Sequence, residues 1–86
     1  MYRLSPSIEY EKSFHKISKK NPLLAIAIQK KVNEIVLSPE HYKPLRNEFK
    51  GYRRVHFGSY VLIYRIKDDV VELITIDHHD FAYKKL

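Results

Sequence analysis

Four consecutive side chains near the C-terminus, Asp77, His78, His79 and Asp80, can each transfer a proton or hold a metal ion. An imidazole has an ordinary pKa of about 6.5, so it can donate or accept a proton near neutral pH. A neighbouring carboxylate, from Asp77 or Asp80, could hold the ring in one tautomer. Three functions are therefore open for this segment: a metal site, a proton-transfer site, or the polar end of an edge strand.

The expected backbone of this segment disfavours the metal site. Consecutive residues of a strand point to opposite faces, so Asp77 and His79 would point away from His78 and Asp80. The chain has no cysteine and no HExxH pattern, which removes the usual zinc-ligand sets. We therefore expect no metal at this segment, and we favour proton transfer over a merely polar strand end.

The chain is also strongly basic. Sixteen Lys and Arg against ten Asp and Glu give a net charge of +6, which suggests a polyanionic partner rather than only a lysine-rich solvated surface. Cations that hold phosphates and rings that stack on bases are typical of single-stranded nucleic acid binding. Both kinds of residue are interleaved in one region: Lys43, Arg46, Lys50, Arg53, Arg54 and Arg65 with Tyr42, Phe49, Tyr52 and Tyr60.

The length and composition restrict the class of protein. A chain of 86 residues predicts one domain over residues 1–86, and an apolar fraction of 44% argues against disorder. No segment approaches the roughly 18–20 apolar residues that cross a bilayer, and the charged N-terminus does not resemble a secretory signal. We expect a cytoplasmic protein without a membrane partner.

Two helices are predicted in the first half of the chain, after a short strand at residues 1–4. In the first, over residues 5–20, Ser5 would be the N-cap and Pro6 the first helical residue. In the second, an apolar stripe runs over residues 22–37, between the start signal at Asn21 and the end signal at Ser38. The tight connection predicts an antiparallel helix hairpin.

Three strands are predicted in the second half, over residues 52–57, 60–66 and 70–77, joined by hairpin turns at residues 58–59 and 68–69. The fold class is therefore α+β, with a two-helix hairpin on one face of a small, mostly antiparallel sheet in the order β-α-α-β-β-β. The other face would be free. Side-chain alternation places Tyr52, Arg54 and His56 on one face, but it does not tell which face meets the helices.

Three short motifs resemble the RelE/ParE superfamily of toxins from type II toxin–antitoxin systems, and the resemblance covers nearly the whole chain. They are Leu45 followed by Gly51-Tyr52-Arg53, then Gly58-Ser59-Tyr60 with the run VLIY, and His79 followed four residues later by Tyr83. The segment KPLRNEFKGYRRVHF is most similar to the YafQ-type branch. The resemblance implies a RelE-like fold.

The resemblance further implies an mRNA interferase, a ribosome-dependent endoribonuclease that cuts mRNA in the ribosomal decoding site without a metal or cofactor. In that reaction an RNA 2′-hydroxyl attacks the adjacent phosphate, which requires a base, a cation and an acid. By position, the catalytic residues would be Arg54, His56 and His79, with Tyr83 stacking on a base. RNA contacts are predicted for Lys43, Arg46, Lys50, Arg53, Arg65, His78 and Asp80.

Two positions depart from the family pattern. Val61 stands where many active members have arginine, and Lys43 stands where the YafQ-type branch often has histidine; Arg65 could replace the missing arginine. Two other functions stay open: a ParE-type inhibitor of DNA gyrase, because ParE members share the fold, or a decayed toxin kept for antitoxin binding, because Val61 departs from the pattern. In each case the resemblance implies an acidic antitoxin partner, whose amphipathic helix would wrap the toxin domain.

Overall fold

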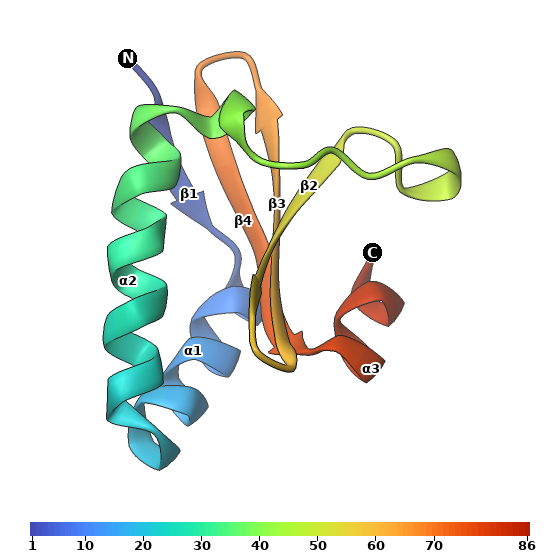
Figure 1. Cartoon of the computed structure of the whole chain (residues 1–86). Helices are drawn as coiled ribbons and strands as arrows, with labels where there is room; N and C mark the ends of the chain where they lie inside the picture. Colours follow the sequence, from blue (N-terminus) through green and yellow to red (C-terminus); the bar gives the residue numbers. More distant parts are fainter.

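The computed structural model describes residues 1–86, and its elements follow the predicted order with one short helix added at the C-terminus (Figure 1). The helices and strands are β1 (Arg3–Pro6), α1 (Ile8–Lys20), α2 (Pro22–Leu37), β2 (Tyr52–Phe57), β3 (Tyr60–Lys67), β4 (Val70–His78) and α3 (His79–Ala82). Three single 3-10 turns are η1 (Pro39–His41), η2 (Asn47–Phe49) and η3 (Tyr83–Lys85). The α+β class is confirmed.

The four strands form one sheet in the order β1-β4-β3-β2. The strands β2, β3 and β4 are antiparallel, whereas β1 pairs in parallel with β4, from Arg3 opposite Val70 to Pro6 opposite Leu73. The hairpin turns at residues 58–59 and 68–69 are confirmed, and Asp68 takes a φ of 57°, a left-handed conformation that Asp tolerates in turns.

The helix α2 begins as predicted, but the start of α1 was predicted wrongly. The Asn21 side chain accepts the Leu24 N–H and caps α2. In α1 the cap is Ser7, whose hydroxyl accepts the Tyr10 N–H at 2.9 Å. Pro6 instead ends β1, because that strand lies at the edge of the sheet, where a residue without an N–H is tolerated.

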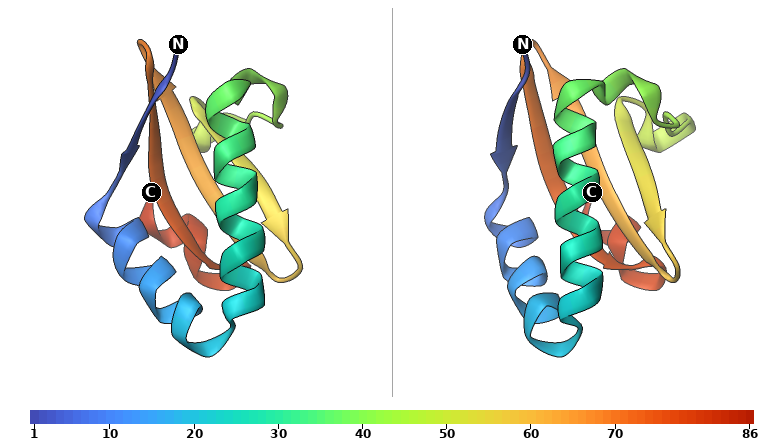
Figure 2. Two further views of the ribbon diagram at one scale, coloured as in Figure 1. Left: turned by 90° about the vertical axis from the view of Figure 1, so that its left-hand side faces the viewer. Right: turned by 60° about the vertical axis from the view of Figure 1, so that its left-hand side comes forward.

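The helices α1 and α2 cover one face of the sheet, while α3 lies against the other (Figures 1 and 2). The main core lies between the sheet and the two long helices, and its fully buried side chains include Ile28, Ile35, Leu62, Tyr64 and Ile76. Val55 and Phe57 of β2 pack against this core. The alternate β2 residues Tyr52, Arg54 and His56 therefore face α3.

The face opposite the long helices is not free, contrary to the prediction. Ala82 of α3 is fully buried and packs with Val61 and Ile63 of β3, and Tyr52 and Tyr83 pack at the edge of this second cluster. The rest of this face carries the polar residues that form the candidate site.

The loop between α2 and β2 is held in place by two side chains of the sheet. The Tyr64 hydroxyl donates to the Pro39 carbonyl at 2.5 Å, and the Arg53 guanidinium donates to the Tyr42 carbonyl at 2.7 Å. Farther along the loop, the Leu45 N–H donates to the Tyr52 carbonyl at 2.8 Å. The loop therefore continues along the outer edge of β2 in a fixed position.

Replacing Tyr64 by phenylalanine should lower the free energy of unfolding by about 1–2 kcal/mol, because the buried Pro39 carbonyl would lose its hydrogen-bond donor. Urea unfolding followed by circular dichroism measures this change. Tyr42→Phe is the matched control, since the Tyr42 hydroxyl makes no hydrogen bond, and it should change stability by less than about 0.5 kcal/mol. Equal effects of the two variants would contradict this role of Tyr64.

None of the helices has the length and apolar character needed to cross a membrane.

Candidate functional site

The candidate site lies on the sheet face opposite α1 and α2. Its centre is Arg54 of β2, which donates a hydrogen bond from Nη1 to the Tyr83 hydroxyl at 2.9 Å. The Tyr83 ring lies against Phe49 of η2, with ring centroids 5.6 Å apart. The C-terminal turn η3 thus meets η2 and β2, which lie about thirty positions earlier in the sequence.

A basic cleft of about 360 Å³ adjoins Arg54. We use the name basic cleft for the depression lined by Lys43, Pro44, Leu45, Arg46 and Arg54. The Arg54 N–H donates to the Lys43 carbonyl at 3.3 Å, so the loop side of the cleft is fixed to β2. Three of its five lining side chains are cationic, which makes it suitable for binding an anion such as a phosphate.

The cations of this region are not neutralised within the chain. Neither Arg54 nor Lys43, Arg46 or Lys50 forms an ion pair with a carboxylate. Lys43, Arg46 and Lys50 are exposed, and Arg54 is half-buried beside Tyr83. Their positive charge therefore remains available to an external polyanion.

Two other arginines predicted to contact RNA already have partners in the fold. Arg53 points toward the long helices and donates to the carbonyls of Glu40 and Tyr42. Arg65 pairs with Glu72, which raises the pKa of Arg65, and its guanidinium lies 5.8 Å from the Tyr52 ring centroid. The structure thus gives Arg53 a role in holding the loop and leaves Arg65 largely neutralised.

The segment of residues 77–80 changes from strand to helix. The strand β4 ends at His78 and α3 begins at His79, and beyond Leu73 the β4 strand has no pairing with β1. Nδ1 of His78 accepts the Asp80 N–H at 3.2 Å and so caps α3. Nδ1 of His79 lies 3.1 Å from the Asp80 carboxylate. The two imidazoles therefore have different surroundings, although their rings stack with centroids 4.4 Å apart.

The prediction that consecutive side chains of this segment point to opposite faces is wrong for His78, His79 and Asp80. Because the backbone turns from strand into helix, ligand atoms of His78, His79 and Asp80 lie within 4.8 Å of one another. These atoms could geometrically contact one ion. However, His79 and Asp80 are exposed, and Nδ1 of His78 already accepts a backbone N–H. The absence of a metal stays a prediction.

The two histidines proposed for catalysis lie at the same end of the sheet. His56 is opposite Val61 of β3, which is opposite Asp77 of β4; with neighbouring strands about 4.8 Å apart, the β2 and β4 backbones are roughly 10 Å apart there. The His79 N–H donates to the Ser59 carbonyl in the turn that follows β2. His56 is exposed and makes no side-chain hydrogen bond, so the structure leaves its imidazole free.

Val61, which stands where many members of the family have arginine, has no room for a longer side chain. The Val61 side chain is fully buried in the cluster with Ala82, so α3 occupies the space into which a longer side chain would extend. The position suggested as its replacement, Arg65, is paired with Glu72. Of Arg54 and Arg65, the two arginines on this face of the sheet, only Arg54 therefore lacks a carboxylate partner.

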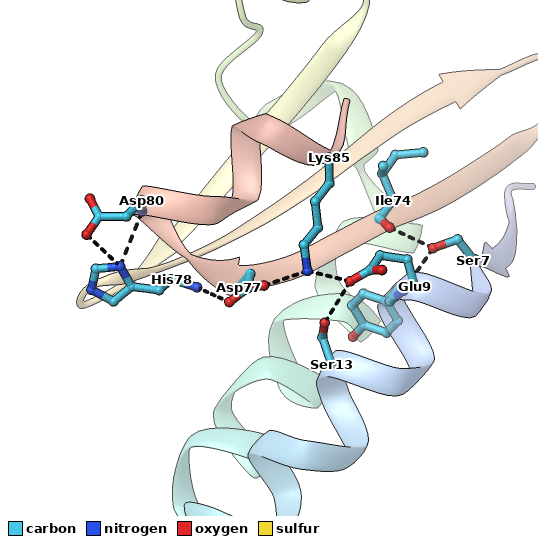
Figure 3. Close-up of polar contacts among 9 residues, drawn as sticks. Ser7, Glu9, Ser13, Ile74, Asp77, His78, Asp80 and Lys85 are labelled. Atoms are coloured by element: carbon cyan, nitrogen blue, oxygen red, sulfur yellow. Dashed lines mark hydrogen bonds and ion pairs between the residues drawn. The ribbon is translucent and has the colours of Figure 1, made fainter.

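Sequence reasoning missed one residue that shapes the site, Lys85. Its Nζ donates to Glu9 Oε2 of α1 at 2.5 Å and to Asp77 Oδ2 of β4 at 2.6 Å (Figure 3). These hydrogen bonds raise the pKa of Lys85, the bond to Asp77 contributing most. Glu9 is 76 positions away in the sequence, so no local pattern could have revealed the pair.

The same contacts set the charge states of the two carboxylates. For Glu9, the hydrogen bond from Lys85 is the largest effect and lowers the pKa. For Asp77, burial alone would raise the pKa, but the hydrogen bonds from Lys85 and from the His78 N–H outweigh it and lower the pKa.

Acidification should therefore loosen the C-terminal segment. Carboxyl groups whose pKa is lowered by folding stabilise the structure above their unfolded pKa of about 4, and this contribution is lost as the pH falls through their folded values. We expect the Tyr83 ring resonances in NMR spectra to shift as the pH falls below about 4, before global unfolding. The Glu9→Gln, Asp77→Asn double variant should lack this transition, and a wild-type Tyr83 that responds only to global unfolding would contradict the prediction.

Known proteins resemble this chain over nearly all of its length. A family model described as the ParE toxin of the type II toxin–antitoxin system parDE matches residues 7–83. A Methanocaldococcus jannaschii protein named "Putative toxin RelE4" is 36% identical over 88 residues, which cover 99% of this chain and 94% of that protein.

Solved structures show the same architecture. The toxin–antitoxin complex RelBE2 from Mycobacterium tuberculosis contains a chain that is 27% identical, with a TM-score of 0.76 and coverage of 91% of this chain and 98% of that chain. A chain of the E. coli DinJ–YafQ complex, 18% identical, has the same fold with a TM-score of 0.75, covering 96% of this chain and 99% of that chain. This protein therefore belongs to the RelE/ParE superfamily of toxins of type II toxin–antitoxin systems.

Proposed function

We propose that this toxin is a ribosome-dependent mRNA endoribonuclease. The observation that carries the proposal is Arg54, which lacks a carboxylate partner, is oriented by the Tyr83 hydroxyl and opens onto the basic cleft. A fixed cation at such a place can stabilise the negative charge that a phosphate gains during displacement. The exposed Lys43, Arg46 and Lys50 would hold the neighbouring phosphates of the RNA strand.

In the proposed reaction, side chains of the toxin make both proton transfers. His56 accepts the proton of the RNA 2′-hydroxyl, whose oxygen forms a bond to the adjacent phosphorus. The bond from phosphorus to the 5′-oxygen of the next nucleotide breaks, and His79 donates a proton to that oxygen. The products are a 2′,3′-cyclic phosphate and a free 5′-hydroxyl, and Arg54 stabilises the intermediate charge.

The surroundings of the two adjacent histidines favour His79 over His78 as the acid. The Asp80 carboxylate beside His79 Nδ1 favours a proton on that nitrogen, which leaves Nε2 of His79 for proton exchange. His78 lies 3.4 Å from the same carboxylate, but a proton on its Nδ1 would break the cap that it provides to α3. We therefore assign proton transfer to His79 and a capping role to His78.

We further propose that the toxin assembles with an acidic antitoxin. The solved RelBE2 structure is a toxin–antitoxin complex, and YafQ was solved in complex with DinJ. The net charge of +6 favours a partner of opposite charge. A catalytically decayed toxin would retain this assembly without cleaving RNA.

A second candidate function is inhibition of DNA gyrase, favoured by the ParE description of the matching family model. Two assays on the purified toxin separate the candidates: synthesis of a reporter in a purified translation system, and supercoiling of plasmid by gyrase. The proposed endoribonuclease should block translation and leave supercoiling unchanged. Blocked supercoiling with normal translation, retained after loss of both His56 and His79, would contradict it.

A further inference from the structure

We propose that Lys85 is a positioning residue, which anchors the C-terminal segment of residues 79–86 to the body of the toxin and thereby holds Tyr83 against Arg54. The positioning part of this inference rests on the proposed endoribonuclease function. The anchoring part concerns the fold alone and can be tested without any activity.

The anchor exists because β1 covers only part of β4. Their pairing ends at Pro6 opposite Leu73, so the last residues of β4 have no strand on that side. There Glu9, from the first turn of α1, comes close to Asp77, and the Lys85 ammonium lies between the two carboxylates (Figure 3). Lys85 thus joins the two faces of the sheet around its open edge.

The partners of Lys85 are themselves held in place. The Ser13 hydroxyl donates to Glu9 Oε2 at 3.1 Å, and the second oxygen of Asp77 accepts the His78 N–H at 2.7 Å. The Lys85 and Asp77 side chains are only 31% and 26% exposed. Because the Lys85 ammonium contacts two carboxylates at once and its contact with Asp77 is partly shielded from solvent, we expect it to hold the segment better than a single exposed ion pair would.

The C-terminal segment depends on few other contacts. The helix α3 has four residues, far fewer than the roughly 12–15 that an isolated helix needs to be even marginally stable. Phe81 is 54% exposed and Leu86 36% exposed, so Ala82 is the one fully buried residue of the segment. The His79 N–H holds one end of the segment to the Ser59 carbonyl, and Lys85 holds the other end.

The position of Tyr83 follows from these two attachments. Tyr83 lies two residues before Lys85, and its hydroxyl accepts the hydrogen bond from Arg54 Nη1. If the far end of the segment is released, Tyr83 loses the constraint that keeps it at hydrogen-bond distance from Arg54. Misplacement of such a group by about 1 Å can lower a rate by as much as 10²-fold.

The test compares Lys85→Met with Lys84→Met in the full-length toxin. Lys84 is the adjacent lysine, with no carboxylate partner and its Nζ 5.8 Å from the Phe81 ring centroid, so both variants lose the same charge. In Lys85→Met, NMR order parameters of residues 80–86 should fall below about 0.6, the range of a flexible backbone. The cleavage rate constant kcat should fall by about 10- to 100-fold, with little change in KM. Lys84→Met should retain the order parameters and the kcat of the wild-type toxin.

Each outcome decides one part of the inference. Unchanged order parameters in Lys85→Met would overturn the anchor. A loosened segment with unchanged cleavage would overturn the positioning role. A wild-type toxin that cleaves no RNA, with a segment that loosens in Lys85→Met, would refute the proposed function and leave the anchor standing. The Glu9→Gln, Asp77→Asn double variant should reproduce the loosening of Lys85→Met without adding to it.

Discussion

Replacing Arg54 by methionine should lower the rate of mRNA cleavage by about 10²–10³-fold, the usual cost of removing one group that stabilises transition-state charge. Methionine keeps the length and packing of the arginine stem but removes the cation beside the basic cleft. The effect should appear in kcat measured on ribosome-bound message, because Lys43, Arg46 and Lys50 remain to bind the RNA strand.

Arg3→Met is the matched control for this variant. It removes the same charge from β1, where Arg3 is exposed and its guanidinium lies 3.4 Å from Asp69, away from the candidate site. The control should cleave at close to the wild-type rate. Tyr83→Phe should fall between the two, because it keeps the ring but removes the hydroxyl that accepts from Arg54. If Arg54→Met were as active as Arg3→Met, Arg54 would not stabilise the reaction.

Replacing His79 by glutamine should lower cleavage by about 10²–10⁴-fold, the range expected for loss of a proton-transfer group. Glutamine keeps a polar side chain of similar size but cannot donate a proton to the leaving 5′-oxygen. His56→Gln should lose activity by a similar factor through loss of the base. The measurement is the single-turnover cleavage rate on programmed ribosomes as a function of pH.

His78→Asn separates the two adjacent histidines. Asparagine is a good helix N-cap, so this variant retains an acceptor for the Asp80 N–H and should cleave at nearly the wild-type rate. If His78→Asn were inactive and His79→Gln active, His78 and not His79 would be the residue that transfers the proton. A His56→Gln, His79→Gln double variant that cuts normally would end the acid–base proposal.

The sequence predicts the sheet and α2 well because their signals are local. Residues 52–57 alternate between the two faces, the turns at residues 58–59 and 68–69 separate the strands, and Asn21-Pro22 starts a largely apolar helix with one buried stripe. The start of α1 was predicted wrongly because SPS contains two serines that could cap a helix. Pairing of β1 with β4, a contact between distant segments, selected Ser7.

The candidate site is less accessible to local reasoning. Alternation fails at His78 because the strand ends there and a helix begins, which changes the direction of every following side chain. The hydrogen bond between Arg54 and Tyr83 spans 29 positions, and the anchor from Lys85 to Glu9 spans 76. The family resemblance selected Arg54 and Tyr83, but only the folded chain shows that they meet.

Ribosome-dependent mRNA cleavage can be tested by mapping the 5′ ends of a transcript in a purified translation reaction, with toxin added and ribosomes present or absent. We expect new 5′-hydroxyl ends at fixed positions within codons, only when ribosomes are present, and far fewer of them with Arg54→Met at the same reaction time. An intact message in the presence of wild-type toxin and translating ribosomes would contradict this expectation, and would favour the gyrase inhibitor or a toxin without catalytic activity.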